Sequence, residues 1–290
     1  MKTYQQLWQS LTPLYDVGEA QAIVRTVLEV KYGMTLTDII CGKVNDLSAD
    51  EGIKLEEIIH RLQKAEPVQY VLGQADFAGR AFHVEPGVLI PRPETAELCR
   101  WITEDCHNIP KASRKHPEDT SKQILDICTG SGCIAITLAL DIPGAEVEGW
   151  DISEEAIRIA QQNVEALEAT QVSIVHQDAL NLPQGGKQWD IIVSNPPYIC
   201  DKEKTEMEQN VLDYEPDIAL FVPDEDPLRF YRAIAEFAST QLFSKGLLYF
   251  EINPIYEKEM REMLEGFRFQ DIETREDFYG KKRMMRATKK

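Results

Sequence analysis

The sequence predicts an α/β protein: a doubly wound, mostly parallel sheet, preceded by a small helical N-terminal domain. Three observations predict this fold class. From residue 123 onward, apolar runs typical of buried strands alternate with amphipathic stretches of helical length. A glycine-rich turn at 128–132 follows the first of these runs and precedes a helix. The preceding region, 1–73, carries its apolar residues at helical spacing. We therefore expect a helical domain at 1–73, a β-hairpin and linker at 74–95, and a main domain at 96–290.

The composition indicates an intracellular globular protein. The chain has 290 residues, enough for two domains, and 43% of them are hydrophobic. No run of some 18 apolar residues occurs, so we expect no membrane span. The N-terminus lacks the apolar core of a signal peptide. The 6 cysteines form no Cys-x-x-Cys pair, which favours reduced thiols over disulfides or a metal site. The expected location is cytoplasmic.

The charge balance bears on the choice of partner. The formal net charge is −18, and so acidic a surface repels phosphate backbones unless a basic patch overrides it. The basic cluster of note is the tail that begins at Lys281. Direct binding of nucleic acid is therefore not expected.

The N-terminal region predicts a helical bundle. Leu7, Leu11 and Leu14 fall on one helical face. Ser48 and Glu51 have the spacing of a capping box, and the helix that they begin is expected to stop at Pro67. The region shows no catalytic chemistry, so a structural cap and a partner-docking domain both fit it.

A hairpin and a proline-rich loop connect the two domains. Residues 77–84 predict a hairpin with Gly79 near its turn. The loop that follows is pinned by two prolines and carries Arg92 and Glu94, and a helix is expected to begin near Thr95. This loop is either a rigid linker or a segment lying over an active site. His107 to Lys122 is expected to be an exposed loop.

The main domain alternates strands and helices in the order of a doubly wound sheet. A helix should follow the glycine-rich turn and run to about Leu140. The other expected helices lie at 154–169, 228–242 and 255–264, and the strands at 124–127, 147–151, 172–175, 189–194 and 247–252. The last two strands, 267–274 and 283–288, are too close in sequence for an intervening helix. They predict an antiparallel hairpin at the sheet edge.

Polar residues follow the carboxyl ends of these strands, where ligands of open α/β sheets bind. The turn Gly130-x-Gly132-x-x-Ala135, with Asp151 some 20 residues further on, also matches a dinucleotide fingerprint. Asp126, however, would repel a pyrophosphate. S-adenosylmethionine fits better, with its ribose at Asp151, its adenine near Asp178, and its ammonium and sulfonium near Asp126.

The stretch Asn195-Pro196-Pro197-Tyr198 ends the apolar strand 189–194. Proline biases its predecessor toward extended backbone, so Asn195 and Pro196 are expected to be extended. The Asn195 side chain and the Pro196 carbonyl then offer two adjacent hydrogen-bond acceptors beside the Tyr198 ring, which suits a planar –NH2 group. The alternative is a tight loop that only ends a strand.

The motif set resembles the protein-(glutamine-N5) methyltransferases that modify peptide chain release factors, a class I S-adenosylmethionine-dependent group. The resemblance covers nearly the whole chain. Cys128 departs from the pattern, which usually has a glycine there. The stretches that carry the resemblance are Asn195-Pro196-Pro197-Tyr198, the glycine-rich turn, Pro67-Val68-Gln69-Tyr70, Phe77-Ala78-Gly79-Arg80-Ala81-Phe82 and Leu89-Ile90-Pro91-Arg92-Pro93-Glu94-Thr95.

The resemblance implies a Rossmann-like, seven-stranded sheet whose last strand is antiparallel, and an N-terminal domain that helps to grip the partner. The implied substrate is the Gln of the Gly-Gly-Gln loop of a release factor. The residues expected to bind the cofactor are Asp126, Cys128, Thr129, Gly130, Ser131, Gly132, Asp151, Asp178, Ala179 and Asn195. Those expected to hold the glutamine are Asn195, Pro196, Pro197, Tyr198 and Arg92, with Asn195, Pro196 and Tyr198 in catalysis.

The expected mechanism follows from the amide, whose nitrogen lone pair is delocalised and poorly nucleophilic. Two acceptors at Asn195 and Pro196 would orient this nitrogen toward the sulfonium methyl group, with no general base acting first. Two rival functions remain open. Asn-Pro-Pro-Tyr also suits adenine-N6 methylation of DNA or RNA, which the acidic surface disfavours. A non-catalytic cofactor-binding adaptor is the other rival.

Overall fold

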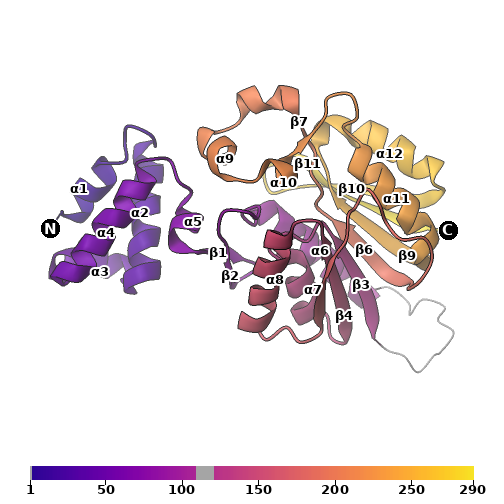
Figure 1. Ribbon diagram of the computed structural model, residues 1–290, viewed down its shortest axis with the longest axis horizontal. Coiled ribbons are helices and arrows are strands. Elements are labelled where there is room, and N and C mark those ends of the chain that lie inside the picture. The colour runs from indigo at the N-terminus through magenta and orange to yellow at the C-terminus, as the bar shows by residue number, and fades with distance from the viewer. Residues whose placement is uncertain (1, 109–120) are drawn as a thin grey trace. The chain divides into compact units, whose positions relative to one another are not determined.

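The computed structural model describes residues 2–108 and 121–290, and Figure 1 shows its elements. The Cα positions divide the chain into two compact units. One comprises Met1–Gln74 with Met207–Tyr214, and the other comprises Ala75–Glu206 with Glu215–Lys290. The sequence analysis did not anticipate that Met207–Tyr214 packs with the helical N-terminal region. Tyr214 Oη donates a 2.8 Å hydrogen bond to the Lys64 carbonyl in that unit.

The first unit is helical, as predicted. Its core contains Leu7, Leu11 and Leu28, all buried, whereas Leu14 is 52% exposed. The predicted capping box is present: the Ser48 side chain accepts from Glu51 N, and Ser48 N donates to the Glu51 carboxylate. The helices are α1 Tyr4–Gln9, α2 Val17–Tyr32, α3 Leu36–Ile40, the 3₁₀ turn Lys43–Asp46, α4 Ala49–Leu62, α5 Val68–Leu72 and α9 Gln209–Tyr214. Helix α4 ends five residues before Pro67, so the proline is not what stops it.

A two-stranded sheet begins the second unit's fold. Strands β1 Gln74–Phe77 and β2 Arg80–His83 pair across a two-residue turn. Ala78 and Gly79 both have positive φ, at 49° and 76°, as a type I′ hairpin turn requires. The hairpin predicted around Gly79 is therefore confirmed.

The second unit contains a seven-stranded sheet in the order β10-β11-β9-β6-β3-β4-β5. The strands are β3 Lys122–Ile127, β4 Ala145–Asp151, β5 Val172–His176, β6 Trp189–Ser194, β9 Leu242–Glu251, β10 Phe269–Glu276 and β11 Lys282–Lys289. Strands β9, β6, β3, β4 and β5 pair in parallel, and β11 pairs antiparallel with both β9 and β10. The predicted mostly parallel sheet and its edge hairpin are confirmed. Strand β9 starts five residues earlier than expected, because it directly follows helix α11 Arg229–Gln241.

Helices cover both faces of this sheet (Figure 1). One core cluster packs α6 Pro93–Asn108 and α7 Cys133–Asp141 against the sheet, and α8 Glu154–Ala166 lies on the same side. The other packs α11 Arg229–Gln241 and α12 Glu257–Gly266 against the opposite face. Because both faces of the sheet are covered, most residues of β3 and β6 are apolar. The loop expected at 107–122 falls mostly outside the described residues, and α6 extends to Asn108.

A smaller substructure connects β6 to α11. Strands β7 Ile199–Cys200 and β8 Phe221–Val222 pair in parallel, and the 3₁₀ turn Asp201–Glu206 and helix α10 Asp217–Leu220 lie in the same connection. None of these short elements was predicted, because segments of two to six residues carry no readable periodicity.

Candidate active site

The sheet order places the predicted polar residues in a row. Strands β6, β3, β4 and β5 are neighbours, and each runs in the same direction. Their carboxyl ends lead into Asn195, Cys128, Asp151 and Asp178 respectively. The connections leave β3 and β6 in opposite directions across the sheet, so this edge is a topological switch point, where ligands of such sheets bind.

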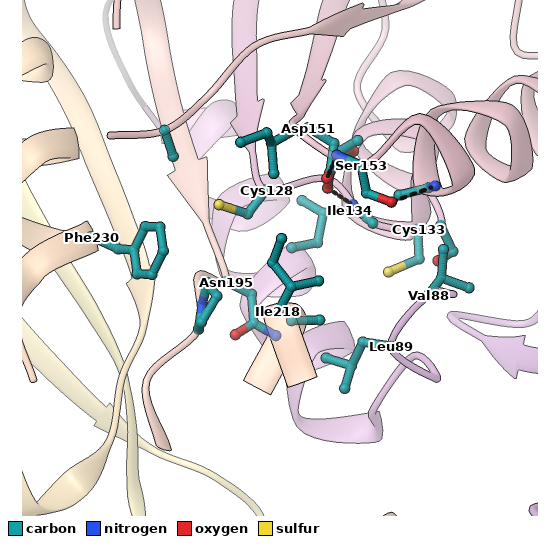
Figure 2. Close-up of a pocket in the computed structure, with 18 of the residues that line it drawn as sticks. Val88, Leu89, Cys128, Cys133, Ile134, Asp151, Ser153, Asn195, Ile218 and Phe230 are labelled. Carbon is teal, nitrogen blue, oxygen red and sulfur yellow. Dashed lines mark hydrogen bonds between the residues drawn. The ribbon is translucent and has the colours of Figure 1, made fainter. Parts of the chain in front are cut away.

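A cavity of about 230 Å³ opens at this edge (Figure 2). Its wall includes most of the residues singled out from the sequence: Arg92, Cys128, Thr129, Gly130, Ser131, Asp151, Asp178, Ala179, Asn195 and Pro197. Four of the predicted residues, Asp126, Gly132, Pro196 and Tyr198, do not line it. The connection between β6 and α11 contributes Ile218 and Ala219 to the wall.

Asp151 holds the glycine-rich turn from the end of β4. Its Oδ2 accepts a 2.8 Å hydrogen bond from Gly130 N, and its Oδ1 accepts a 2.9 Å bond from Ser153 N (Figure 2). Burial raises the pKa of the Asp151 carboxyl above its usual range, whereas these backbone hydrogen bonds lower it. Each oxygen of an ionised carboxylate can accept more than one hydrogen bond, so the group retains acceptor capacity for a ligand in the cavity.

The turn adopts the backbone that glycine favours, although it contains a cysteine. Cys128 has φ +64°, and Gly130 and Gly132 also have positive φ. The turn closes through a 2.9 Å bond from Gly132 N to the Thr129 carbonyl, and buried Asn163 donates to the Ser131 carbonyl. Cys128 therefore has a left-handed backbone conformation that glycine adopts more easily than a residue with a side chain.

The strain at Cys128 leads to a stability prediction. A side chain with Cβ in the left-handed region costs roughly 1–2 kcal/mol, and β-branching makes that region still less accessible. We expect Cys128→Val to unfold at a lower urea concentration than Cys128→Gly, with a free energy of unfolding about 1–2 kcal/mol smaller. Equal midpoints for the two variants would show that position 128 is not strained.

Asp126 lies beneath the turn, fully buried, and not in the cavity wall. Its Oδ2 accepts hydrogen bonds from Thr129 Oγ1 (2.6 Å) and Ala135 N (3.2 Å). Its Oδ1 has no partner among the described residues. Burial raises the pKa of this carboxyl to about 7, against the hydrogen bonds, which lower it. An unpaired, buried carboxylate oxygen is costly without a cation or donor.

Asp126 should make the ligand-free protein less stable as the pH rises. Its pKa is about 7 in the folded chain and 3.8 in a model compound, so the folded state binds more protons between these values. The free energy of unfolding should therefore fall as the pH rises through this window. Asp126→Asn cannot titrate, so its stability relative to wild type should increase from pH 4 to pH 8 in urea titrations. A constant difference across this range would contradict the raised pKa.

Asn195 presents an acceptor to the cavity. Its Nδ2 donates to Thr95 Oγ1 at 3.4 Å, at the N-terminal end of α6, and its side chain is part of the cavity wall. With the –NH2 end engaged, Oδ1 is the atom available to a ligand.

The rest of the motif lies deeper. Pro196 is buried, and Tyr198 packs against the core cluster on the α11 face while its Oη donates to Glu251 Oε1 at 3.0 Å. Burial raises the pKa of Tyr198 well above its usual range, so the phenol stays protonated. The structure thus brings Asn195 and Pro197 to the cavity but places Tyr198 behind it.

Arg92 lines the cavity but is already paired. Its guanidinium forms an ion pair with Glu215, whose side chain is 1% exposed and also accepts from Ile90 N at 3.0 Å. Sequence inspection missed Glu215, which lies 123 residues from Arg92 and has no local signal. Among the described lining residues, Arg92 is the one formal cation, while Asp151 and Asp178 are anions. The cavity therefore favours a cationic ligand over a phosphate.

The sequence analysis missed two residues that contact the Asn195-to-Tyr198 motif. Thr95 was noted only as a helix start, and Glu251 only as part of a strand. A carboxylate at the carboxyl end of an apolar strand is the same signal that identified Asp151, so Glu251 was discoverable in this way. Among the described residues, no cluster fits a metal ion and no helix is long and apolar enough to cross a membrane.

Solved structures with a similar fold include two methyltransferases. The delta-N METTL16 methyltransferase domain matches at TM-score 0.54 and 18% identity, covering 78% of this chain and 96% of that one. The T. thermophilus 16S rRNA N2 G1207 methyltransferase RsmC, solved with AdoMet and guanosine, matches at TM-score 0.52 and 22% identity, covering 75% and 50%. At these identities the matches support the fold alone.

Sequence comparison identifies the family. Residues 5–73 match the PrmC N-terminal domain, and residues 113–214 match the methyltransferase small domain. The release factor glutamine methyltransferase of Bacteroides thetaiotaomicron is 49% identical over 282 residues, 97% of each chain. That of Flavobacterium psychrophilum is 39% identical, covering 99% of this chain and 98% of its own. The chain belongs to the release factor glutamine methyltransferases, a family of class I methyltransferase fold.

Proposed function

We propose that this protein transfers a methyl group from S-adenosylmethionine to the side-chain amide nitrogen of the Gln in the Gly-Gly-Gln motif of peptide chain release factors. The observation that carries the proposal is the orientation of Asn195, whose Nδ2 is engaged by Thr95 and whose Oδ1 is left to the cavity. Family membership favours glutamine over the adenine amino group, for which the same motif would serve. A release factor substrate places the reaction in the cytoplasm.

The cavity fits S-adenosylmethionine on three features of its donor set. Asp151 offers two carboxylate oxygens for ribose hydroxyls, and the loop at Asp178 and Ala179 lies beside the turn to receive the adenine. Asp126 does not line the cavity, but its unpaired Oδ1 is buried beneath the turn, and a carboxylate there favours a cationic group in the cavity through its charge, without direct contact. The backbone at Cys128, Thr129, Gly130, Ser131 and Gly132 completes this side of the site. The bound cofactor supplies the methyl group as an electrophilic sulfonium.

The chain's own residues act on the glutamine. Asn195 Oδ1 and the Pro196 carbonyl accept the two amide hydrogens, which fixes the direction of the nitrogen and increases its electron density. Orientation of this kind accounts for up to roughly 7–11 kcal/mol of a barrier. Pro197 and Arg92 border the site, and Tyr198 supports the amide-binding segment from behind. No side chain need remove a proton first, because the nitrogen becomes acidic once it is alkylated.

The direct test is to find which residue of a release factor receives a labelled methyl group. The protein is incubated with methyl-labelled S-adenosylmethionine and a purified release factor, and the product is digested and mapped. Label on the glutamine of Gly-Gly-Gln is the expected result, with a release factor carrying Gln→Glu at that position as the control. Label on another residue, or on adenine when DNA or RNA replaces the release factor, would refute the proposal.

A further inference from the structure

A buried carboxylate lies behind the amide-binding motif, outside the mechanism described above. Glu251 ends β9, the neighbour of β6, and it is 2% exposed. Because Ser194 pairs with Phe250 across these strands, Glu251 lies level with Asn195. The Glu251 backbone carbonyl is held by Tyr231 Oη at 3.0 Å. The side chain is therefore fixed beside the site.

The two oxygens of Glu251 each accept one hydroxyl. Oε2 accepts from Thr95 Oγ1 at 2.6 Å, and Oε1 accepts from Tyr198 Oη at 3.0 Å. Tyr198 is held a second time, because Asn253 Nδ2 donates to its carbonyl at 3.2 Å. The Glu251 carboxylate is thus linked to both ends of the Asn195-to-Tyr198 motif. It bonds Tyr198 directly, and it is connected to Asn195 through Thr95.

These contacts fix the direction of each hydrogen bond. Burial raises the pKa of the Glu251 carboxyl, whereas the hydrogen bonds from Thr95 and Tyr198 lower it. In its ionised form the carboxylate can only accept, so Thr95 Oγ1 donates its single hydroxyl hydrogen to Glu251 Oε2. The Thr95 oxygen then has only lone pairs for Asn195, and it accepts from Nδ2 at 3.4 Å. The reverse orientation of the Asn195 carboxamide would place Oδ1 against those lone pairs and turn –NH2 into the cavity. Two –NH2 groups, one from Asn195 and one from the substrate, would then face each other as donors.

We propose that Thr95 and Glu251 are positioning residues that orient the Asn195 carboxamide so that its oxygen, and not its –NH2 group, faces the substrate amide. This inference rests on the proposed function, in which Asn195 Oδ1 accepts an amide hydrogen. Thr95 lines the cavity and Glu251 lies outside its wall, and neither side chain is placed against the reacting atoms. Their effect passes through Asn195, and this dependence is what the experiment measures.

The experiment compares Thr95→Val, which removes the hydroxyl at constant shape, with Thr95→Ser, which keeps it. Loss of one oriented hydrogen bond should lower kcat by about 10-fold in Thr95→Val, with the Kd for S-adenosylmethionine within a factor of two. Thr95→Ser should recover most of the rate. Thr103→Val is the matched control, because Thr103 lies two turns further along α6, outside the cavity wall, and bonds the Cys99 carbonyl.

The double variant with Asn195→Ala separates a positioning role from a structural one. If Thr95 acts through Asn195, adding Thr95→Val to Asn195→Ala should cause less than a twofold further loss of kcat. A full 10-fold further loss would overturn the inference, as would wild-type kcat in Thr95→Val alone. Glu251→Gln is the second variant should Thr95→Val fold poorly. The amide that this substitution introduces can donate a hydrogen bond to Thr95, which would reverse the donor and acceptor roles along the series from residue 251 through Thr95 to Asn195. Glu251→Gln should therefore lower kcat in the wild-type background but not in Asn195→Ala.

Failure of the proposed function and failure of the positioning inference would give different results. Wild-type kcat in Asn195→Ala would refute the acceptor role of Asn195 in the proposed function. Loss of activity in Asn195→Ala together with wild-type kcat in both Thr95→Val and Glu251→Gln would refute only the positioning inference. Thermal unfolding of each variant checks that the fold is retained.

Discussion

Asn195→Ala is expected to lower methyl transfer by roughly 10²-fold or more, which is the cost of losing one oriented transition-state hydrogen bond. The side chain provides the acceptor that faces the cavity, while the backbone of the turn and Asp151 are separate from it. Binding of S-adenosylmethionine should therefore stay within a few-fold of wild type. Single-turnover transfer to a release factor gives the rate, and calorimetry gives the affinity.

The control for this variant is Asn181→Ala. Asn181 is also an asparagine of the second unit, but its side chain is exposed and lies outside the cavity wall. It should transfer methyl groups at the wild-type rate. Full turnover by Asn195→Ala, or an equal loss in both variants, would contradict the role assigned to Asn195.

Local patterns were sufficient for the fold and for most of the residues expected at the site. Strands β3 and β6 are recognisable because both faces of the sheet are covered, which makes most residues of each strand apolar. Asp151, Asp178 and Asn195 are recognisable because each lies at, or within two residues of, the carboxyl end of a strand. Parallel pairing then brings them to one edge without any long-range information.

The remaining site residues depend on tertiary contacts that no local pattern encodes. Glu215 pairs with Arg92 across 123 residues, and Thr95 bonds Glu251 across 156. The sequence also led us to place Tyr198 and Asp126 as ligand contacts, yet both lie behind the cavity wall. A sequence motif shows that a residue lies near the site. Whether its side chain lines the cavity or points into the core depends on the packing around it. Tyr198 packs toward the core because its ring gains more from burial there than from a solvent-facing position.

Asp151→Ala is expected to raise the Kd for S-adenosylmethionine by roughly 10²-fold, while kcat at saturating cofactor changes only several-fold. A hydrogen bond to a charged group contributes about 1.5–3 kcal/mol, so the loss of the bonds to the ribose accounts for at least this factor. The same carboxylate also accepts from Gly130 N in the turn and from Ser153 N at the N-cap of α8, so its removal leaves both backbone donors without their acceptor. Both effects weaken cofactor binding and leave Asn195 in place.

Glu146→Ala is the matched control, because Glu146 lies five residues earlier on β4, is exposed and contacts Gln123 instead of the cavity. Its Kd should equal that of the wild type. The pattern expected for Asp151→Ala, a weakened Kd with a preserved kcat, is the opposite of that for Asn195→Ala. The two ends of the cavity then have separable roles: Asp151 serves the cofactor and Asn195 serves the amide. If Asp151→Ala instead lost kcat at an unchanged Kd, the cofactor would have to bind elsewhere on the sheet edge, and the direction of transfer proposed here would be wrong.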